Sequence, residues 1–487
     1  MKGLFAKKSI HDLKEEAEDK KGGLERTLTA KNLISMGIGA IIGAGVFVLV
    51  GQAAAVYAGP AVVFSFLLAA IICVFAAFCY AEFASLIPVA GGAYSYSYAT
   101  LGEIVAWTIG WGLTFEYLFS SATVAVGWSG YLSSILNDFG LHLPMKIASS
   151  PLVYEIGTGW VKTGAIVNLP AMAIMGGIGI MIAVGINAAA KFNNLMVIVK
   201  LTVILLFIGC GIAFIKPSNW VPFIPPNTGT FGEFGFSGIL RGAGVVFFAF
   251  IGFDALSTLA QEAKNPQKDM PTGMIGSLGI AASLYILMAL VLTGVVSYTA
   301  LTGPAPFSVA LNAFGPNFVW LRYVAKIGIL MGLSSVILVM LLGQTRVFYS
   351  MSRDGLLPKA FGKVHKKFHT PFFNTMVMTL FGMAICGFFP VGFLGQLTSI
   401  GTLMAFAIVC FGVLILRYRQ PSLHRPFKVP FFPWIPLAGT LACLLQMAVL
   451  PAVVWIQLIC WTFLGYVIYF GYSIRHSHIR KKHKSSK

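Results

Sequence analysis

The sequence predicts an all-α polytopic membrane protein, and two features of its composition support this fold class. Hydrophobic residues make up 57% of the 487 residues and charged residues only 10%, whereas a soluble domain carries roughly 25% charged residues. The mean hydropathy is +0.83. So few charges cannot cover a water-facing surface, and we therefore expect lipid to surround most of the chain.

Long hydrophobic runs predict twelve transmembrane helices. A helix needs about 20 apolar residues to cross the hydrocarbon core of a bilayer. The runs that reach this length lie near residues 33–56, 60–83, 103–133, 166–188, 191–215, 239–262, 272–298, 319–346, 371–391, 395–417, 431–450 and 452–473. An even number of spans places both ends of the chain on the same side of the membrane.

The basic residues between the runs predict which side that is. If the N-terminus is cytoplasmic, the inner segments hold most of the 34 Lys and Arg residues, as the positive-inside rule requires. The net charge of +18 then needs no nucleic acid partner. We expect the basic tail at residues 480–484 to lie near anionic lipid headgroups. The seven cysteines all fall in apolar runs and predict no metal or redox motif.

Two of the runs are interrupted at positions where a helix is expected to break. Four glycines lie within residues 37–45, and each costs about 1 kcal/mol relative to alanine inside a helix. The sixth run carries Gly252 and Asp254 in an aromatic stretch. Unwound backbone at membrane depth is tolerated where it lines a cavity, so two broken helices, five helices apart, predict a binding site. Close helix packing through small residues is the alternative explanation of the glycines.

Several ordered stretches of the chain resemble the amino acid–polyamine–organocation superfamily, and within it the bacterial relatives of cationic amino acid transporters. The stretches are residues 39–47, residues 88–96, residues 248–254 with Glu262 and Asn265-Pro266 following, and residues 352–358. Together they cover nearly the whole chain. The resemblance implies two inverted five-helix repeats plus two extra helices in a bacterial cytoplasmic membrane, with a substrate site between the broken first and sixth helices.

On this fold the chain divides into five segments. They are a cytoplasmic N-terminal tail at residues 1–32, a first five-helix repeat at 33–217, a second, inverted repeat at 218–418, two additional transmembrane helices at 419–473 and a basic cytoplasmic tail at 474–487.

The resemblance also implies which residues bind an amino acid substrate. The substrate carboxylate would meet backbone N–H groups of the first break, because the N-terminus of a half-helix is a ready anion site. These N–H groups belong to Gly43, Ala44 and Gly45. The substrate ammonium would meet carbonyl groups that lack intrahelical partners. The implied acceptors are Ile41, Phe248 and Ile251, and Phe248 also matches an aromatic lid.

Met340 maps to the side-chain end of this pocket. A thioether offers no partner to a cationic side chain, which favours uptake of neutral L-amino acids. Transport or exchange of arginine and lysine is the alternative, and a sensor or channel on the same fold is an alternative from another class. We expect no catalytic residue, cofactor or metal, since every histidine lies in a tail or loop and the chain has no phosphate-binding loop motif.

Ionisable groups inside the runs are candidate functional residues, because they are costly at membrane depth. The resemblance implies that the amine of Lys200 replaces the sodium ion of sodium-driven relatives, beside the hydroxyl groups of Ser334 and Ser335. Glu116 matches a position implicated in proton handling. We therefore expect protons to drive transport, with structural hydrogen bonding as the alternative for Lys200 and Glu116. Asp254 is expected either to cap the second break or to form a pair near it.

Overall fold

The computed structural model describes residues 4–18, 26–43, 45–155, 159–301, 306–448 and 452–485. The helices of the first half are α1 (Ile10–Glu18), α2 (Ala30–Ile41), α3 (Val50–Gln52), α4 (Val62–Leu86), α5 (Ala93–Thr100), α6 (Glu103–Asp138), α7 (Met145–Ala148), α8 (Leu169–Val184) and α9 (Ile186–Ile212). Those of the second half are α10 (Gly235–Phe247), α11 (Pro266–Val295), α12 (Pro306–Ala313), α13 (Val319–Arg353), α14 (Phe372–Phe388), α15 (Val391–Arg419), α16 (Trp434–Ala448), α17 (Ala452–Ile468), α18 (Ile474–His476) and α19 (His478–Ser485). Strands β1 (Leu152–Glu155) and β2 (Gly159–Lys162) pair in an antiparallel hairpin.

The described residues contain seven helical segments that are long and apolar enough to cross a membrane, and the shorter apolar helices α8, α14 and α16. The seven segments are Ala53–Leu86, Ile186–Ile212, Gly235–Glu262, Pro266–Val295, Pro316–Arg353, Thr398–Arg419 and Val454–His476. The chain is therefore a helical, polytopic membrane protein. The number of twelve spans and the inverted relation of the two repeats stay predictions.

The long helices pack in two groups that meet at α2. Helix α4 contacts both α10 and α11, and α2 packs along α11. Helices α6, α8, α13 and α14 form a second set of contacts, and α9 joins α13 to α2. Because α2 contacts α11, α9 and α13, the first interrupted run lies between the two groups.

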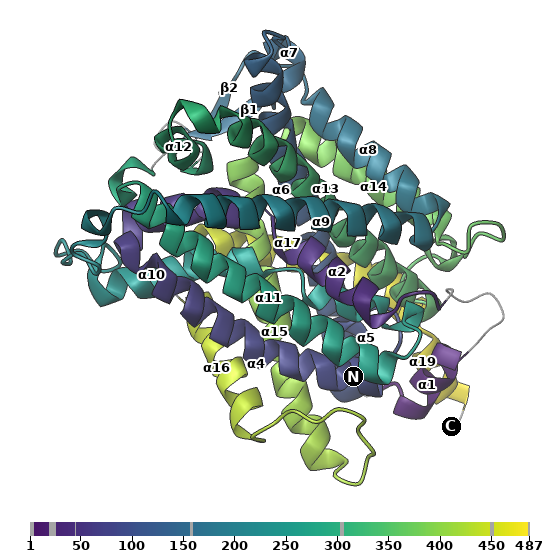
Figure 1. The fold of residues 1–487 in the computed structure, drawn as a ribbon. Coiled ribbons are helices and arrows are strands. Elements are labelled where there is room, and N and C mark those ends of the chain that lie inside the picture. Colours follow the sequence, from purple (N-terminus) through teal and green to yellow (C-terminus); the bar gives the residue numbers. More distant parts are fainter. Residues whose placement is uncertain are drawn as a thin grey trace.

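The two ends of the chain lie together at one end of the bundle. In Figure 1, α1 and α19 are neighbours at the lower right, whereas α7 and the β1–β2 hairpin lie at the top of the view. The end that carries residues 4–18 and 473–485 is called the tail end below. Apolar side chains on the outside of α9, α16 and α17 are exposed, among them Ile198, Leu445 and Phe463. Exposed apolar surface of this kind is expected where lipid touches the protein.

Candidate functional site

The first interrupted run breaks just after α2. Thr29 caps the N-terminus of α2, because its side chain accepts a hydrogen bond from the backbone N–H of Asn32, and the last helical residue is Ile41. Ile42 is extended, with φ −77° and ψ 100°, and a π-helical turn begins at Gly45. The carbonyls at the end of α2 therefore cannot all find partners inside the helix.

The second interrupted run breaks just after α10. The helix ends at Phe247, a short 3-10 turn covers Phe248–Phe250, and the next residue, Ile251, is extended. Gly252 follows with φ +124°, a conformation that favours glycine. The chain then continues as a 3-10 helix over Asp254–Glu262. Like the first break, this break therefore has backbone N–H and C=O groups that lack partners within the helix and can bond to other groups.

A small cavity of about 20 Å³ lies between the two breaks. Six residues that the sequence proposed for the substrate site line it, namely Ile41, Gly43, Gly45, Phe248, Ile251 and Met340. The seventh, Ala44, lies outside the described residues. Ala40, Ser120, Val124 and Val336 complete the lining. None of these lining residues carries a charge, so the cavity is an apolar space edged by backbone groups.

Two glycines of the first break allow its backbone to lie close to other helices. A Cβ atom added at Gly45 would lie 2.3 Å from the Cα atom of Ala249, on the second break. A Cβ atom at Gly43 would lie 2.7 Å from a methyl group of Val336 on α13. The two broken segments are therefore in direct backbone contact beside the cavity.

Lys200 of α9 is fully buried and reaches the end of α2. Its Nζ atom donates hydrogen bonds to the carbonyl oxygens of Gly39 and Ile42, each at 2.8 Å, and to Oγ of Ser335 at 2.9 Å. A cation at a helix C-terminus also meets the negative end of the helix dipole. An ammonium group has three donor hydrogens, and three acceptors surround it here.

The two neighbouring serines of α13 differ in their contacts. The Ser335 hydroxyl lies 3.0 Å from the Gly39 carbonyl oxygen as well as close to Lys200. The Ser334 hydroxyl donates to the carbonyl of Leu330 in its own helix, at 2.9 Å. Of the two serines, Ser335 thus binds Lys200, whereas Ser334 bonds within its own helix.

Comparison with known proteins identifies the family to which this chain belongs. The family model described as "Amino acid permease" matches residues 28–475. The chain belongs to the amino acid permease family. This permease is 43% identical to the methylthioribose transporter of Bacillus subtilis (strain 168), over 99% of this chain and 100% of that protein. It is 44% identical to the branched-chain amino acid permease BcaP of the same organism, with the same coverage.

A more distant relative of the permease is the vacuolar cationic amino acid transporter 4 of Arabidopsis thaliana. The two are 34% identical over 87% of this chain and 68% of that protein. The family model and these relatives confirm the resemblance to the amino acid–polyamine–organocation superfamily. They also confirm that the protein is a permease and not an enzyme.

Two buried carboxylates of the permease, those of Asp254 and Glu116, lie near the second break. Asp254 accepts a hydrogen bond from the Gly252 N–H at 3.1 Å and one from the Tyr117 hydroxyl at 2.5 Å. Asp254 thus contacts both the backbone of the second break and a side chain of α6, and the choice between its two expected roles stays open. Glu116, adjacent to Tyr117 on α6, is fully buried, and its carboxylate lies near Asp254 and the Thr402 side chain.

Two polar residues at the site, Ser120 and Tyr285, are not predicted by the sequence. Ser120 lies one helical turn beyond Glu116 and lines the cavity, and its buried hydroxyl makes no hydrogen bond to a described residue. Tyr285 of α11 contacts both breaks through its hydroxyl group. A serine or tyrosine in an apolar run carries no charge to mark it, so only the helix packing reveals these two residues.

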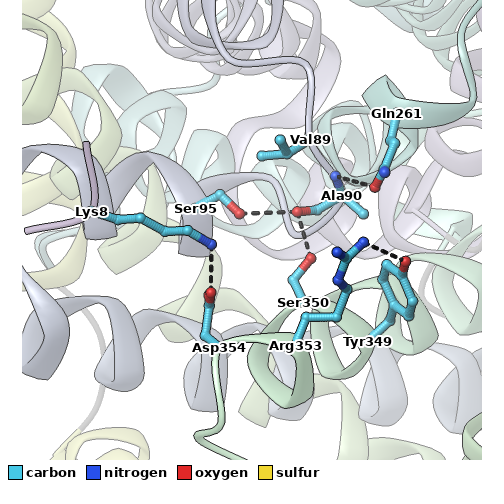
Figure 2. Close-up of a pocket in the computed structure, with 9 residues that line it drawn as sticks. All are labelled: Lys8, Val89, Ala90, Ser95, Gln261, Tyr349, Ser350, Arg353 and Asp354. Carbon is cyan, nitrogen blue, oxygen red and sulfur yellow. Dashed lines mark hydrogen bonds and ion pairs between the residues drawn. The ribbon is translucent and has the colours of Figure 1, made fainter. Parts of the chain in front are cut away.

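The tail end of the permease is closed by polar contacts, which Figure 2 shows around a second small pocket. Lys8 reaches Asp354 at 2.5 Å, and the side chains of both residues are buried. Asp354 also accepts a hydrogen bond from the Tyr94 hydroxyl at 2.6 Å. Ser95 and Ser350 both donate to the Ala90 carbonyl, at 2.9 and 2.6 Å. The N-terminal segment is thus tied to the end of α13.

The C-terminal segment is tied to the same end of the bundle through Glu103, the first residue of α6. Glu103 is buried and accepts hydrogen bonds from Tyr469 at 2.7 Å, from Arg480 at 2.6 Å and from Ser477. Tyr98 also donates to Glu103, at 2.9 Å. Burial is the main cause that raises the pKa of Tyr98, and the nearby carboxylates of Asp354 and Glu103 raise it further. The Tyr98 hydroxyl therefore stays protonated and can donate a hydrogen bond.

Three further ion pairs, formed by two carboxylates, lie inside the bundle. Arg346 of α13 forms a two-pronged pair with Glu262, at 2.7 and 3.2 Å, and both side chains are buried. Arg417 binds Glu82 of α4, with Arg425 3.3 Å from the same carboxylate. Buried charges need such partners, and these pairs hold neighbouring helices together.

Proposed function

We propose that the protein is a secondary active transporter that takes up neutral L-amino acids, driven by protons, by alternating access. The observation that carries the proposal is the cavity between the two breaks. Its lining combines backbone groups of both breaks with apolar side chains and one hydroxyl. Backbone N–H and C=O groups suit the carboxylate and ammonium that all amino acids share, and an apolar lining suits a neutral side chain.

We also propose the orientation and location of the protein. The excess of Lys and Arg in the segments between alternate runs favours cytoplasmic termini, and the basic tail would then face anionic lipid. The bacterial relatives support a bacterial cytoplasmic membrane. In this orientation the tail end, with its Lys8–Asp354 pair, would be the cytoplasmic face.

Methylthioribose is the second candidate substrate, because the relative named as its transporter is as similar as the branched-chain permease. It is a neutral sugar with a thioether and has neither an ammonium nor a carboxylate group. Cationic amino acids are a third candidate, and their support is the more distant plant relative. The absence of a charged residue from the cavity lining favours the two neutral substrates.

Flux into proteoliposomes that contain the purified protein tests these candidates directly. We expect labelled leucine or alanine to accumulate when the external pH is lower than the internal pH, with or without sodium. Excess unlabelled branched-chain amino acid should compete, whereas arginine and methylthioribose should compete weakly. Strong competition by methylthioribose alone, or a requirement for sodium, would contradict the proposal. Binding without flux would favour a sensor.

The proposed proton coupling depends on Lys200. A neutral amine has two donor hydrogens, so loss of the proton leaves one of the three acceptors at Gly39, Ile42 and Ser335 without its donor. Deprotonation would therefore loosen the contact of α9 and α13 with the end of α2. A ligand or proton shifts a conformational equilibrium only through such a difference between its states.

We predict that Lys200→Gln keeps substrate binding but abolishes accumulation driven by a pH gradient. Glutamine still donates hydrogen bonds to the carbonyls of α2, yet it cannot gain or lose a proton near neutral pH. Uptake and counterflow are measured in proteoliposomes between pH 5 and 8. Lys191→Gln is the matched control, because Lys191 lies on the same helix and is exposed. An unchanged pH profile in Lys200→Gln would rule out the mechanism.

A further inference from the structure

One side chain of the cavity carries a polar group that has no partner. Among the described residues that line the cavity, Ser120 of α6 is the only one whose side chain bears a hydroxyl group. Ser120 is 2% exposed, and its buried Oγ atom hydrogen-bonds to no described residue. A hydroxyl group that is taken out of water without a hydrogen-bond partner is unfavourable, so a partner for this group is expected.

This hydroxyl differs from its neighbours on the same helix. A serine or threonine inside a helix can donate to a carbonyl oxygen three or four residues earlier in the chain. Thr114, Ser121 and Thr123 do so within α6, at 2.9, 2.8 and 2.7 Å. Ser120 makes no such bond, although it is the residue next to Ser121. The helix therefore leaves the Ser120 hydroxyl for a partner in the cavity.

Ser120 belongs to the part of the cavity that side chains of two packed helices line. The two breaks contribute backbone groups, whereas α6 contributes Ser120 and Val124, one helical turn apart, and α13 contributes Val336 and Met340. In the proposed function the backbone groups bind the carboxylate and ammonium of the substrate. The substrate side chain then meets α6 and α13, where Ser120 carries the one hydroxyl among these four residues.

We infer that Ser120 is a specificity-determining residue whose hydroxyl hydrogen-bonds to a hydroxyl group on the substrate side chain. The permease should then prefer serine and threonine to alanine and valine. The inference rests on the proposed function and narrows its substrate class from neutral to hydroxyl-bearing amino acids. The cavity is small, about 20 Å³, which suits such compact side chains.

The chemistry of two hydroxyl groups explains the preference. Each has one hydrogen to donate and two lone pairs to accept, so either group can be the donor. Valine has nearly the shape of threonine but carries a methyl group in place of the hydroxyl, and its binding would leave the Ser120 Oγ atom without a partner. A site that hydrogen-bonds a substrate hydroxyl discriminates against the analogue without it for this reason, whereas an apolar pocket distinguishes the two poorly.

The test is a comparison of threonine and valine uptake in proteoliposomes, each measured as kcat/KM. We expect the parent to favour threonine about tenfold. Ser120→Ala removes only the oxygen and should make the two values equal to within about twofold, chiefly by lowering threonine uptake. Ser121→Ala is the matched control and should keep the parent ratio, because the Ser121 hydroxyl bonds to the Leu118 carbonyl of its own helix. A residue that mattered only for packing would change the uptake of both substrates alike.

A parent that does not favour threonine over valine would overturn the inference, and so would Ser120→Ala with the parent ratio. If Ser120→Ala fails to fold, Ser120→Cys replaces it, because a thiol fills the same place but is a weak hydrogen-bonding group. A ratio that falls about threefold or more in that variant supports the inference, and a smaller change contradicts it. Failure of the proposed function is a separate result, since the parent would then take up neither threonine nor valine.

Discussion

Met340 of α13 is the side chain that closes the apolar side of the cavity. It lines the cavity beside Val336, and its terminal methyl group would lie 2.9 Å from a Cβ atom added at Gly252. The methionine therefore fills the space next to the second break. Methionine is flexible and adapts to irregular gaps, so its replacement is expected to alter substrate choice more than stability.

We predict that Met340→Ser admits cationic amino acids. The shorter side chain makes room in the cavity, and its hydroxyl offers an oxygen acceptor to a guanidinium or ammonium group. Competition of labelled alanine uptake by arginine should be at least several-fold stronger in the variant than in the parent. Met340→Leu, which keeps an apolar side chain of similar volume, should behave as the parent does. Efficient arginine transport by the parent would show that Met340 does not exclude cations.

At the scale of residues, charge decides what the sequence can predict. Lys200 is recognisable in the sequence because a cation in an apolar run is rare, and the structure places it at the α2 carbonyls. Tyr285 is not recognisable in the same way, because it carries no charge. Its acceptors are 244 and 36 residues away along the chain, and only the packing of α11 on both breaks brings these atoms together.

At the scale of elements, the two breaks are the most predictable feature. Clustered glycines marked the first break and a Gly–x–Asp sequence marked the second, and the helices do end at Ile41 and Phe247. The sequence predicted neither the π-helical turn that begins at Gly45 nor the close approach of Gly45 to Ala249, because residues about 200 positions apart meet there. The division into inverted repeats stays a prediction.

We predict that Gly45→Ala reduces amino acid uptake at least tenfold. The added Cβ atom would lie 2.3 Å from the Cα atom of Ala249 and 2.9 Å from its nitrogen, so the two backbones must separate. Gly127→Ala on α6 is the matched control, since a Cβ atom there meets no atom within 4 Å. Uptake per folded transporter is compared for both variants. Normal uptake by Gly45→Ala would show that closure of the site does not need this contact.

At the scale of the whole molecule, both chain ends are tied to one face. The N-terminal segment pairs its backbone with the start of α6, through Glu103 N–H to Ala6 at 3.0 Å and Ile104 N–H to Leu4 at 3.0 Å. Lys8 then reaches Asp354 at the end of α13. In the proposed orientation, substrate leaves through this face only after these contacts separate, so the N-terminal segment would be part of the inner closure.

We predict that Asp354→Asn opens the tail end. The substitution removes the carboxylate charge that lies 2.5 Å from the buried Lys8 ammonium, and breaking a buried ion pair costs roughly 3–5 kcal/mol. A Val89→Cys reporter, in the pocket lining, should react with a soluble maleimide at least tenfold faster in this background than with Asp354 present. Asp12→Asn, which removes a longer, exposed pair with Lys482, should leave the labelling rate unchanged. Equal rates in all three backgrounds would contradict the prediction.

The contact between Lys8 and Asp354 also constrains how the protein is made. Its two residues are 346 positions apart, and ribosomes add roughly 5–20 residues per second. The N-terminal segment therefore leaves the ribosome on the order of tens of seconds before its partner exists, and most of the helices are inserted during that delay. The part of the chain that is synthesised first is thus among the last to reach its final position.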